Sequence, residues 1–364
     1  MNWRNALFIA VLCCAALAQS PTADYRRIAV GESIEFPRDH GAHPDTKTEW
    51  WYLTGHFADA QGREFGLQFT IFRSALSAKP VAEGASPLRA HQVYLGHLAL
   101  ADIRAGELRF ADRLRRAGTA LATASTTDMD LALDDWSLTR FEGDRMELRA
   151  ADPTAGLRVE LELLPRKPLV LHGRDGVSAK GAEPGNASVY SSWTRLGAEG
   201  TLAVDGKLHA ITGECWFDHE YGSSVLGEGV RGWDWFGLQL DDGRELMLFY
   251  LRHEDGTPQP ASAGTLIDRD GRATPLTKDG FEIEASGAWK SPRNDARYPN
   301  AWRIQVPAYD LDLNLAPRIA DCEIGSESNT GVIYWEGPVR ITGTQTGRGY
   351  AELTGYAGSM TGRF

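Results

Sequence analysis

Cysteine is scarce in this chain. Four cysteines occur in 364 residues, and Cys13 and Cys14 lie in an apolar segment at the start. The other two, Cys215 and Cys322, have no spacing typical of a zinc site. In an exported protein they form either a disulfide or two buried thiols. A disulfide would close a loop of about 100 residues and contribute roughly 4 to 5 kcal/mol in the chain-entropy model.

Long apolar runs are also scarce. One run, at 6–17, follows Arg4, and small residues stand at Ala16 and Ala18. This pattern predicts a signal peptide over 1–18 that is cleaved on export, and the run is too short for a membrane anchor. No second run of membrane length follows. We therefore expect a periplasmic or secreted protein with no integral membrane segment after cleavage.

Basic residues are fewer than acidic residues. Lys and Arg number 38 against 49 Asp and Glu, and the net charge is −11, with the basic residues scattered along the chain. Nucleic acids and anionic lipid surfaces select basic patches, so neither is expected as a partner. The sequence also lacks a Gly-x-Ser-x-Gly elbow, a phosphate-binding Gly-x-x-x-x-Gly-Lys loop and a His-Glu-x-x-His zinc motif.

Helical periodicity is rare, whereas alternation of apolar and polar residues is common. Alternating runs occur at 64–72, 157–163, 201–204, 245–251, 302–306, 311–315 and 337–343. Asp-Gly pairs such as Asp205-Gly206 and Asp242-Gly243 supply turns between them. Many short antiparallel strands at this spacing are typical of barrels or sandwiches. The segment 112–122 is the best candidate for a short helix.

The length predicts two domains, at roughly 150 residues for each. A stretch rich in Gly, Lys and Asp, at 173–187, is the expected seam between them. We therefore expect the signal peptide at 1–18, an N-terminal domain at 19–190 and a C-terminal domain at 191–364.

Acids and aromatic residues alternate most densely at 213–240. The acids and the histidine there are Glu214, Asp218, His219, Glu220 and Asp234, and the aromatic residues include Trp216, Phe217, Tyr221, Trp233, Trp235 and Phe236. Burial without a cation partner raises the pKa of a carboxyl until it holds a proton at neutral pH. A proton donor in an aromatic pocket is what acid chemistry on an apolar substrate requires.

Six motifs follow one another along the chain. They are His40-Gly-Ala-His-Pro-Asp-Thr-Lys-Thr-Glu-Trp-Trp-Tyr-Leu-Thr-Gly55, Gly213-Glu-Cys-Trp-Phe-Asp-His-Glu-Tyr-Gly-Ser-Ser224, Gly232-Trp-Asp-Trp-Phe-Gly-Leu-Gln-Leu240, Gly264-Thr-Leu-Ile-Asp268, Ala296-Arg-Tyr-Pro-Asn-Ala-Trp302, and Tyr334-Trp-Glu-Gly through Gly349-Tyr-Ala-Glu-Leu-Thr-Gly355. Together they resemble the carotenoid 1,2-hydratase and AttH-like family of secreted lipocalin-like proteins over nearly all of the mature chain. The resemblance implies two lipocalin-like antiparallel β-barrel domains packed together, with a shared pocket near their interface.

The resemblance also implies an activity, the addition of water to an isoprenoid double bond. That reaction needs an acid to protonate one carbon, a surface that tolerates the cation, and a water to capture it. Asp218 corresponds to the aspartate implicated in the family, and Glu220 or His219 would orient or deprotonate the water. The π faces of Trp216, Tyr221, Trp233 and Trp235 would stabilise the cation by ~0.5 to 2 kcal/mol each.

The same segment also has a structural interpretation. In a strand at 212–221, Cys215, Phe217, His219 and Tyr221 share one face, and Glu214, Trp216, Asp218 and Glu220 share the other. Three acids on one face describe an ordinary solvent face, or ion pairs with Arg231, Arg244 or Arg252. The residues alone favour this interpretation, whereas the resemblance supports the catalytic one.

A second cluster lies in the first motif and contains Asp39, His40, His43, Asp45 and Glu49. The spacing of His40 and His43 occurs in some metal sites, but no third ligand follows at a diagnostic distance, so no metal is expected. Glu49 is either a buried acid with a raised pKa or a strand-end carboxylate paired with Arg73.

The expected partner is an apolar small molecule such as an isoprenoid, a polyene or a lipid, and no cofactor is expected. The candidates for contact with it are Glu49, Trp50, Trp51, Trp216, Tyr221, Trp233 and Trp235. A tryptophan near the start of the first strand often plugs a lipocalin-like barrel, which favours packing for Trp50 or Trp51, and likewise for Trp335 with Glu336. The alternatives to a hydratase are a carrier without catalysis and a protein that shapes a polyene during cyclisation.

Overall fold

The structure is a computed structural model that describes residues 25–78, 91–118, 120–223, 226–227, 229–326 and 330–360. The expected signal peptide at 1–18 lies outside the described residues. Helix is limited to the short 3-10 turns η2 (Arg38–His40), η3 (Glu142–Asp144), η4 (Lys278–Gly280) and η5 (Pro307–Tyr309) in this part of the chain. No helix among the described residues has the length and apolar character needed to cross a bilayer.

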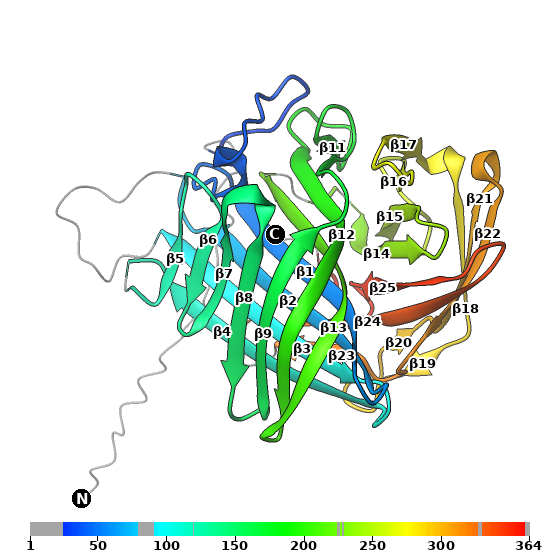
Figure 1. The fold of residues 1–364 in the computed structure, drawn as a ribbon. Helices are drawn as coiled ribbons and strands as arrows, with labels where there is room; N and C mark the ends of the chain where they lie inside the picture. The colour runs from blue at the N-terminus through cyan, green and yellow to red at the C-terminus, as the bar shows by residue number, and fades with distance from the viewer. Residues whose placement is uncertain are drawn as a thin grey trace, which may run out of the picture.

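The first sheet has thirteen strands and curls into a nearly closed barrel (Figure 1). Its strands are β1 (Thr48–Asp59), β2 (Glu64–Ala75), β3 (Gln92–Asp102), β4 (Glu107–Arg116), β5 (Ala122–Ala124), β6 (Asp130–Leu133), β7 (Trp136–Arg140), β8 (Met146–Asp152), β9 (Leu157–Pro165), β10 (Val170–Leu171), β11 (Val177–Ala179), β12 (Ala187–Val204) and β13 (Lys207–Gly222). The order β4-β3-β2-β1-β13-β12-β9-β8-β7-β6-β5 brings β1 and β13, which lie far apart in the chain, side by side.

The second sheet has ten strands and forms a half-barrel beside the first (Figure 1). Its strands are β14 (Val230–Leu240), β15 (Glu245–His253), β16 (Ala263–Ile267), β17 (Ala273–Thr277), β18 (Glu282–Ser286), β21 (Ala301–Val306), β22 (Leu311–Pro317), β23 (Glu323–Ser326), β24 (Val332–Gly343) and β25 (Gly347–Leu353). A separate pair, β19 (Trp289–Lys290) and β20 (Arg297–Tyr298), completes the described strands.

The predicted all-β architecture of two lipocalin-like barrels is confirmed, and each predicted alternating run lies within a strand. The Asp205-Gly206 turn joins β12 to β13 with φ values of 50° and 78°. Positive φ at both positions is what a two-residue type I′ hairpin requires. The predicted helix at 112–122 is wrong, because residues 112–116 belong to β4, which pairs with β3 along its whole length.

The predicted boundary between residues 190 and 191 cuts through β12. Both partners of β12 along the sheet, β9 and β13, belong to the first sheet. The two sheets therefore divide after β13, between Gly222 and Val230. The stretch at 173–187 lies within the first domain and contains the short strand β11, which pairs with β12. The long β12–β13 hairpin then returns the chain to β1.

The three largest of the five groups of buried apolar side chains in the described residues lie in the two sheets and between them. One fills the first barrel and a second fills the half-barrel. The third joins the two sheets and includes Tyr52, Trp216, Trp235 and Phe249. Burial of each large apolar side chain is worth roughly 1.5 to 3 kcal/mol, so this third group holds the domains in a fixed arrangement.

The two remaining cysteines are free thiols. Cys215 is buried in the core of the first sheet, and Cys322 is buried in the core of the second. The disulfide that the sequence left open is therefore not formed.

Candidate functional site

Strand β13 has two faces with different surroundings. Cys215 and Phe217 point into the core of the first barrel. Asp218 and Glu220 point the other way and line a cavity between the two sheets. The alternation predicted for 212–221 is thus present, but the acidic face is covered by the second domain, and Asp218 is only 3% exposed.

The cavity has a volume of about 140 Å³. Strands β1, β12 and β13 of the first sheet and β14, β15, β24 and β25 of the second all contribute to its walls. Its apolar lining includes Trp50, Leu226, Trp233, Trp235, Phe249 and Leu251. A cavity of about 150 Å³ in another protein holds benzene, so this cavity accepts a compact group the size of one ring.

Asp218 is held in the cavity wall by three neutral donors. Its carboxyl accepts hydrogen bonds from the Ser192 hydroxyl, from the Tyr190 hydroxyl at 2.7 Å and from the Trp216 indole Nε1 at 2.6 Å. Burial raises the pKa of Asp218 to about 7, because it outweighs these three hydrogen bonds, and the charge of Glu220 raises it further. Asp218 can therefore hold or release a proton near neutral pH.

A second layer of residues fixes those donors. His172 Nε2 lies 2.7 Å from the Ser192 hydroxyl, and His172 Nδ1 lies 2.9 Å from the Thr265 hydroxyl of the second sheet. Burial lowers the pKa of His172 to about 3, so it is neutral. The Trp235 indole donates to the Tyr190 hydroxyl at 3.1 Å. Side chains of both domains thus orient the groups that bind Asp218.

Glu220 differs from Asp218 because it has a cation partner. Lys180 Nζ lies 2.9 Å from Glu220 Oε1, and the Ser188 hydroxyl donates to the same carboxylate. The ammonium group also lies 4.3 Å from the centre of the Phe249 ring. Lys180 therefore neutralises the negative charge of Glu220 at the edge of the cavity.

The second domain contributes two further acids, Glu336 and Glu352, which face each other across β24 and β25. Glu336 is 2% exposed and accepts a hydrogen bond from the Tyr52 hydroxyl at 2.6 Å. Burial and the charge of Glu352 raise its pKa well above the usual value. The pKa of Glu352 is raised to about 7, mainly by burial and also by the charges of Asp218 and Glu220. A hydrogen bond with Trp233 partly offsets this rise.

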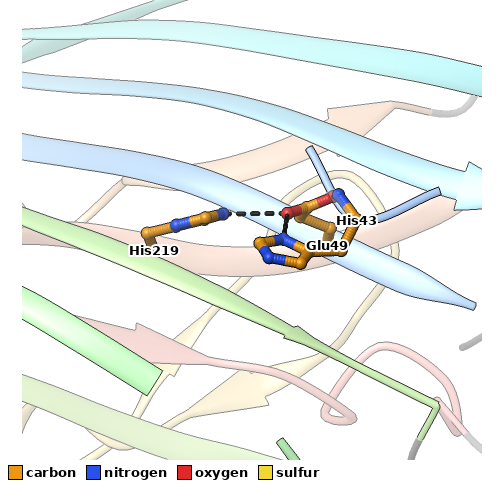
Figure 2. Close-up of side chains that lie close together, drawn as sticks. All are labelled: His43, Glu49 and His219. Atoms are coloured by element: carbon orange, nitrogen blue, oxygen red, sulfur yellow. Dashed lines mark hydrogen bonds and ion pairs between the residues drawn. The ribbon is translucent and has the colours of Figure 1, made fainter. Parts of the chain in front are cut away.

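The opposite face of β13 belongs to a network around Glu49 (Figure 2). His43 Nδ1 and His219 Nε2 lie 2.8 and 2.9 Å from the same oxygen, Glu49 Oε1, and Arg73 Nε donates to Oε2 at 2.7 Å. Burial alone would raise the pKa of Glu49. The Arg73 guanidinium and the two imidazoles outweigh it, so the pKa lies well below its usual range.

Comparison with known proteins identifies the family and supports the fold. The family model of AttH-like proteins matches residues 27–356. This chain belongs to the AttH-like family. The crystal structure of an AttH protein of Nitrosomonas europaea is similar to it over 91% of this chain and 99% of that one, with a TM-score of 0.82 and 34% identity.

Two other proteins are less similar to this AttH-like protein. The crystal structure of kievitone hydratase of Nectria haematococca shares the fold at a TM-score of 0.68 and 13% identity, over 92% of this chain and 97% of that one. Dehydratase asqC of Emericella nidulans is 22% identical over 200 residues, which are 51% of this chain and 55% of the dehydratase. This AttH-like protein thus spans about half the length of that curated relative.

The Glu49 network changes the prediction for the first motif. His40 and His43, whose spacing occurs in some metal sites, have different surroundings: the His40 ring stacks on Trp193 at 4.9 Å, whereas His43 binds Glu49. His43, Glu49 and His219 are three potential metal ligands whose donor atoms lie within 4.8 Å of one another. Sequence spacing did not reveal His219 as the third member. The Arg73 guanidinium already neutralises the charge of Glu49. His43, Glu49 and His219 therefore stabilise the end of the barrel as a hydrogen-bonded network.

Four predicted site residues lie outside the cavity. Glu49, Trp51, His219 and Tyr221 all belong to this network: Trp51 stacks on His219 at 5.0 Å, and Tyr221 stacks on His43 at 3.4 Å. The predicted role of His219 in binding water beside Asp218 is corrected, because successive residues of a strand point to opposite faces. His219 and Asp218 are neighbours in sequence only.

The other predicted site residues are at the cavity. Asp218, Glu220, Trp50, Trp233 and Trp235 line it. Trp216 lies behind the wall and binds Asp218 through its indole. The ion pairs suggested between the acids of β13 and Arg231, Arg244 or Arg252 do not form; Glu214 binds Arg195 and Arg348, and Arg252 binds Asp234.

Sequence reasoning missed Glu352 and gave Glu336 only a packing role. Both lie in the last motif, within Tyr334-Trp-Glu-Gly and Gly349-Tyr-Ala-Glu-Leu. Each acid lies within two positions of an aromatic residue: Glu336 follows Trp335, and Glu352 lies two positions after Tyr350. Asp218 likewise follows an aromatic residue. That likeness was the available signal, but only the contact between the domains shows that all three acids share one cavity.

Proposed function

We propose that this AttH-like protein adds water to a double bond of a compact apolar substrate, or removes water in the reverse reaction. The observation that carries the proposal is the environment of Asp218. It is a buried carboxyl with neutral donors only, it faces an apolar cavity, and its pKa of about 7 lets it exchange a proton at physiological pH.

In the hydration direction, Asp218 donates its proton to one carbon of the alkene. The O–H bond of Asp218 breaks, a C–H bond forms, and the other carbon becomes a cation. The rings of Trp50, Trp233 and Trp235 line the same cavity and stabilise that cation through their π faces. A water molecule then forms the C–O bond and loses one proton.

The relatives support this class of reaction. The name kievitone hydratase describes addition of water, and the name dehydratase describes removal of water. Addition and removal of water are the two directions of one reaction, and an acid of pKa near neutrality serves either.

The volume of the cavity sets the expected substrate class. At about 140 Å³ it encloses one ring or one isoprenoid unit. We propose that the reacting end of an apolar molecule, with a trisubstituted double bond, enters the cavity. A polyene or carotenoid would fit only if the rest of the molecule remained outside.

We also propose that the protein is exported, as the segment at 1–18 suggests. Fractionation of the host should recover the chain outside the cytoplasm, and a fusion that lacks residues 1–18 should remain inside. Recovery of both forms in the cytoplasm would contradict export without affecting the proposed reaction.

The direct test of the reaction uses ¹⁸O-labelled water. Purified protein is incubated with (3-methylbut-2-enyl)benzene, which has one ring and one trisubstituted double bond, and with an apolar extract of the host. Mass spectrometry should detect ¹⁸O in an alcohol product, and Asp218→Asn should abolish the label while quenching of tryptophan fluorescence shows that the probe still binds.

The matched control is Glu284→Gln, because Glu284 is an exposed acid on β18, at the edge of the second sheet. It should leave labelling unchanged. Binding without ¹⁸O incorporation by the unaltered protein would favour the alternative, a carrier that uses the same cavity without catalysis.

A further inference from the structure

The cavity contains four carboxyl groups, and their partners differ. Asp218 binds three neutral donors, and Glu220 is paired with Lys180. Glu336 and Glu352 come from the second domain. The hydration proposed above uses Asp218 as the acid, and it also needs a base for the proton of the attacking water. The partners of the other three acids show which one is available.

Glu220 is engaged by a cation and a hydroxyl. Its Oε1 lies 2.9 Å from Lys180 Nζ, and the Ser188 hydroxyl donates to it. The carboxylate of Glu220 is thus already occupied by an ion pair and a hydrogen bond. Glu220 also lies on the same strand as Asp218, so it approaches a bound substrate from the same wall.

Glu336 is engaged by two tyrosines. The Tyr52 hydroxyl donates to Oε1 at 2.6 Å, and the Tyr334 hydroxyl forms a second hydrogen bond with the carboxyl. His97 Nδ1, from β3 of the first domain, lies 2.8 Å from the Tyr334 hydroxyl and fixes it in turn. Glu336 is therefore a fixed group at the contact between the domains.

Glu352 differs from these three. It lines the cavity and is partly exposed as a residue, whereas Asp218, Glu220 and Glu336 are no more than 4% exposed. Its neighbours across the sheet are Glu336 on β24 and Trp235 on β14. Its carboxyl forms a hydrogen bond with Trp233, and, unlike Glu220, it forms no ion pair with a Lys, Arg or His of the described part of the chain.

We propose that Glu352 is the general base of the reaction, and that it takes a proton from the attacking water while Asp218 protonates the alkene from the opposite domain. This inference rests on the proposed hydration. One O–H bond of water breaks as the C–O bond forms, and its proton passes to the Glu352 carboxylate. Return of that proton through water to Asp218 restores the starting state, so the net change is addition of one water molecule.

The Glu336–Glu352 pair favours this division of roles. Two adjacent carboxyls that line one cavity do not both ionise readily, so a proton on one allows the other to remain charged. The pKa of Glu336 is raised well above its usual value, whereas that of Glu352 is about 7. Burial raises the pKa of both acids, so the pair holds a proton near neutral pH, and Glu352, the less buried of the two, is the member that meets water from the cavity.

The test separates protonation of the substrate from capture of water. The probe (3-methylbut-2-enyl)benzene is incubated in D₂O enriched in ¹⁸O. Reversible protonation by Asp218 exchanges deuterium into the recovered alkene, and water capture places ¹⁸O in the alcohol. Glu352→Gln should keep deuterium exchange and lower ¹⁸O incorporation by roughly 100-fold or more, the usual contribution of a general base.

Two further variants make this result specific. Asp218→Asn should lose both labels, and the exposed control Glu284→Gln should keep both. Glu352→Asp, which retains a carboxylate, should recover part of the ¹⁸O incorporation. Circular dichroism and quenching of tryptophan fluorescence by the probe should show that each variant is folded and binds.

The outcomes distinguish the two proposals. If the unaltered protein incorporates neither label from the probe or from the host extract, the hydration itself is wrong. If it incorporates both labels and Glu352→Gln does too, hydration stands and the role of Glu352 is overturned. A folded, probe-binding Glu352→Gln that loses both labels also overturns it, because a base for water is not needed for deuterium exchange.

Discussion

Glu49 and Asp218 are two buried carboxyls on adjacent strands, and they have opposite electrostatic surroundings. Glu49 is bound by the Arg73 guanidinium and two imidazoles, and its pKa lies well below the usual range. Asp218 is bound by two hydroxyls and an indole, and its pKa rises to about 7. Both are almost fully buried. The charge of the partner, rather than depth of burial, decides which one keeps a proton.

The two sites also differ in what covers them. The Glu49 network lies at the end of one barrel and involves only the first domain. The Asp218 site lies on the outer face of that barrel and is completed by Trp235, Glu336 and Glu352 of the second domain. One face of β13 therefore stabilises a domain, whereas the other face lines a cavity that the second domain completes.

The largest effect is expected when the cation of the Glu49 network is removed. Arg73→Met leaves a buried carboxylate without its main counter-charge, and breaking a buried pair in this way costs about 3 to 5 kcal/mol. Urea unfolding followed by circular dichroism should show this loss. A change below about 1 kcal/mol would contradict the structural role given to Arg73.

The second effect concerns Asp218 and pH. Its folded-state pKa of about 7 lies above its ordinary value of 3.8, so the folded state binds more protons between the two. Its contribution to stability is fully present below about pH 4 and is lost as pH rises through about 7. Between about pH 5 and pH 8 the unaltered protein should lose roughly 2 to 3 kcal/mol more unfolding free energy than Asp218→Asn does.

Parallel unfolding curves for the two proteins over that range would mean that Asp218 is already ionised in the folded state. The control is Glu284→Gln, which should follow the unaltered protein at every pH because Glu284 is exposed.

The third effect sharpens the comparison by removing one neutral donor. Tyr190→Phe deletes the hydroxyl that donates to Asp218 Oδ2 at 2.7 Å. Because that hydrogen bond favours the carboxylate, its loss should raise the pKa of Asp218 by about 1 unit. The pH at which ¹⁸O incorporation falls to half its maximum on the alkaline side should move upward with it. A downward shift would contradict the assignment of Asp218 as the acid.

The smallest effect is expected at an exposed ion pair, which provides the baseline. Arg303 binds Asp312 at 2.6 Å on the outer surface of the second sheet, with both side chains partly exposed. Exposed pairs contribute about 0 to 1 kcal/mol, so Arg303→Ala should change unfolding free energy by less than about 1 kcal/mol. A larger loss would show that proximity alone, without burial, gives strong pairs in this protein.

Sequence patterns predicted much of the local structure. The alternation at 212–221 correctly separated His219 from Asp218, and the Asp205-Gly206 pair correctly marked a hairpin. Both follow from local geometry, because side chains alternate along a strand and a type I′ turn needs positive φ. The family resemblance then supplied the barrel topology.

Features that depend on contacts between distant strands were not predicted. The second sheet converts an apparently solvent-facing acidic strand into a cavity wall, and Glu352 joins Asp218 there from a position far along the chain. His219 joins His43 and Glu49 through the pairing of β1 with β13. The domain boundary was also missed. The stretch at 173–187 resembles a linker, so the start of β12 (Ala187–Val204), which directly follows it, was taken for the start of the second domain.

The protonation state of Asp218 is the central claim, and infrared difference spectroscopy measures it directly. We predict that carbonyl bands of two protonated carboxyls, Asp218 and Glu352, disappear as pH rises through about 7. Asp218→Asn should remove one of these bands, and Glu352→Gln should remove the other and retain the Asp218 band. Loss of the Asp218 band by about pH 5, as for an ordinary aspartate, would contradict the account.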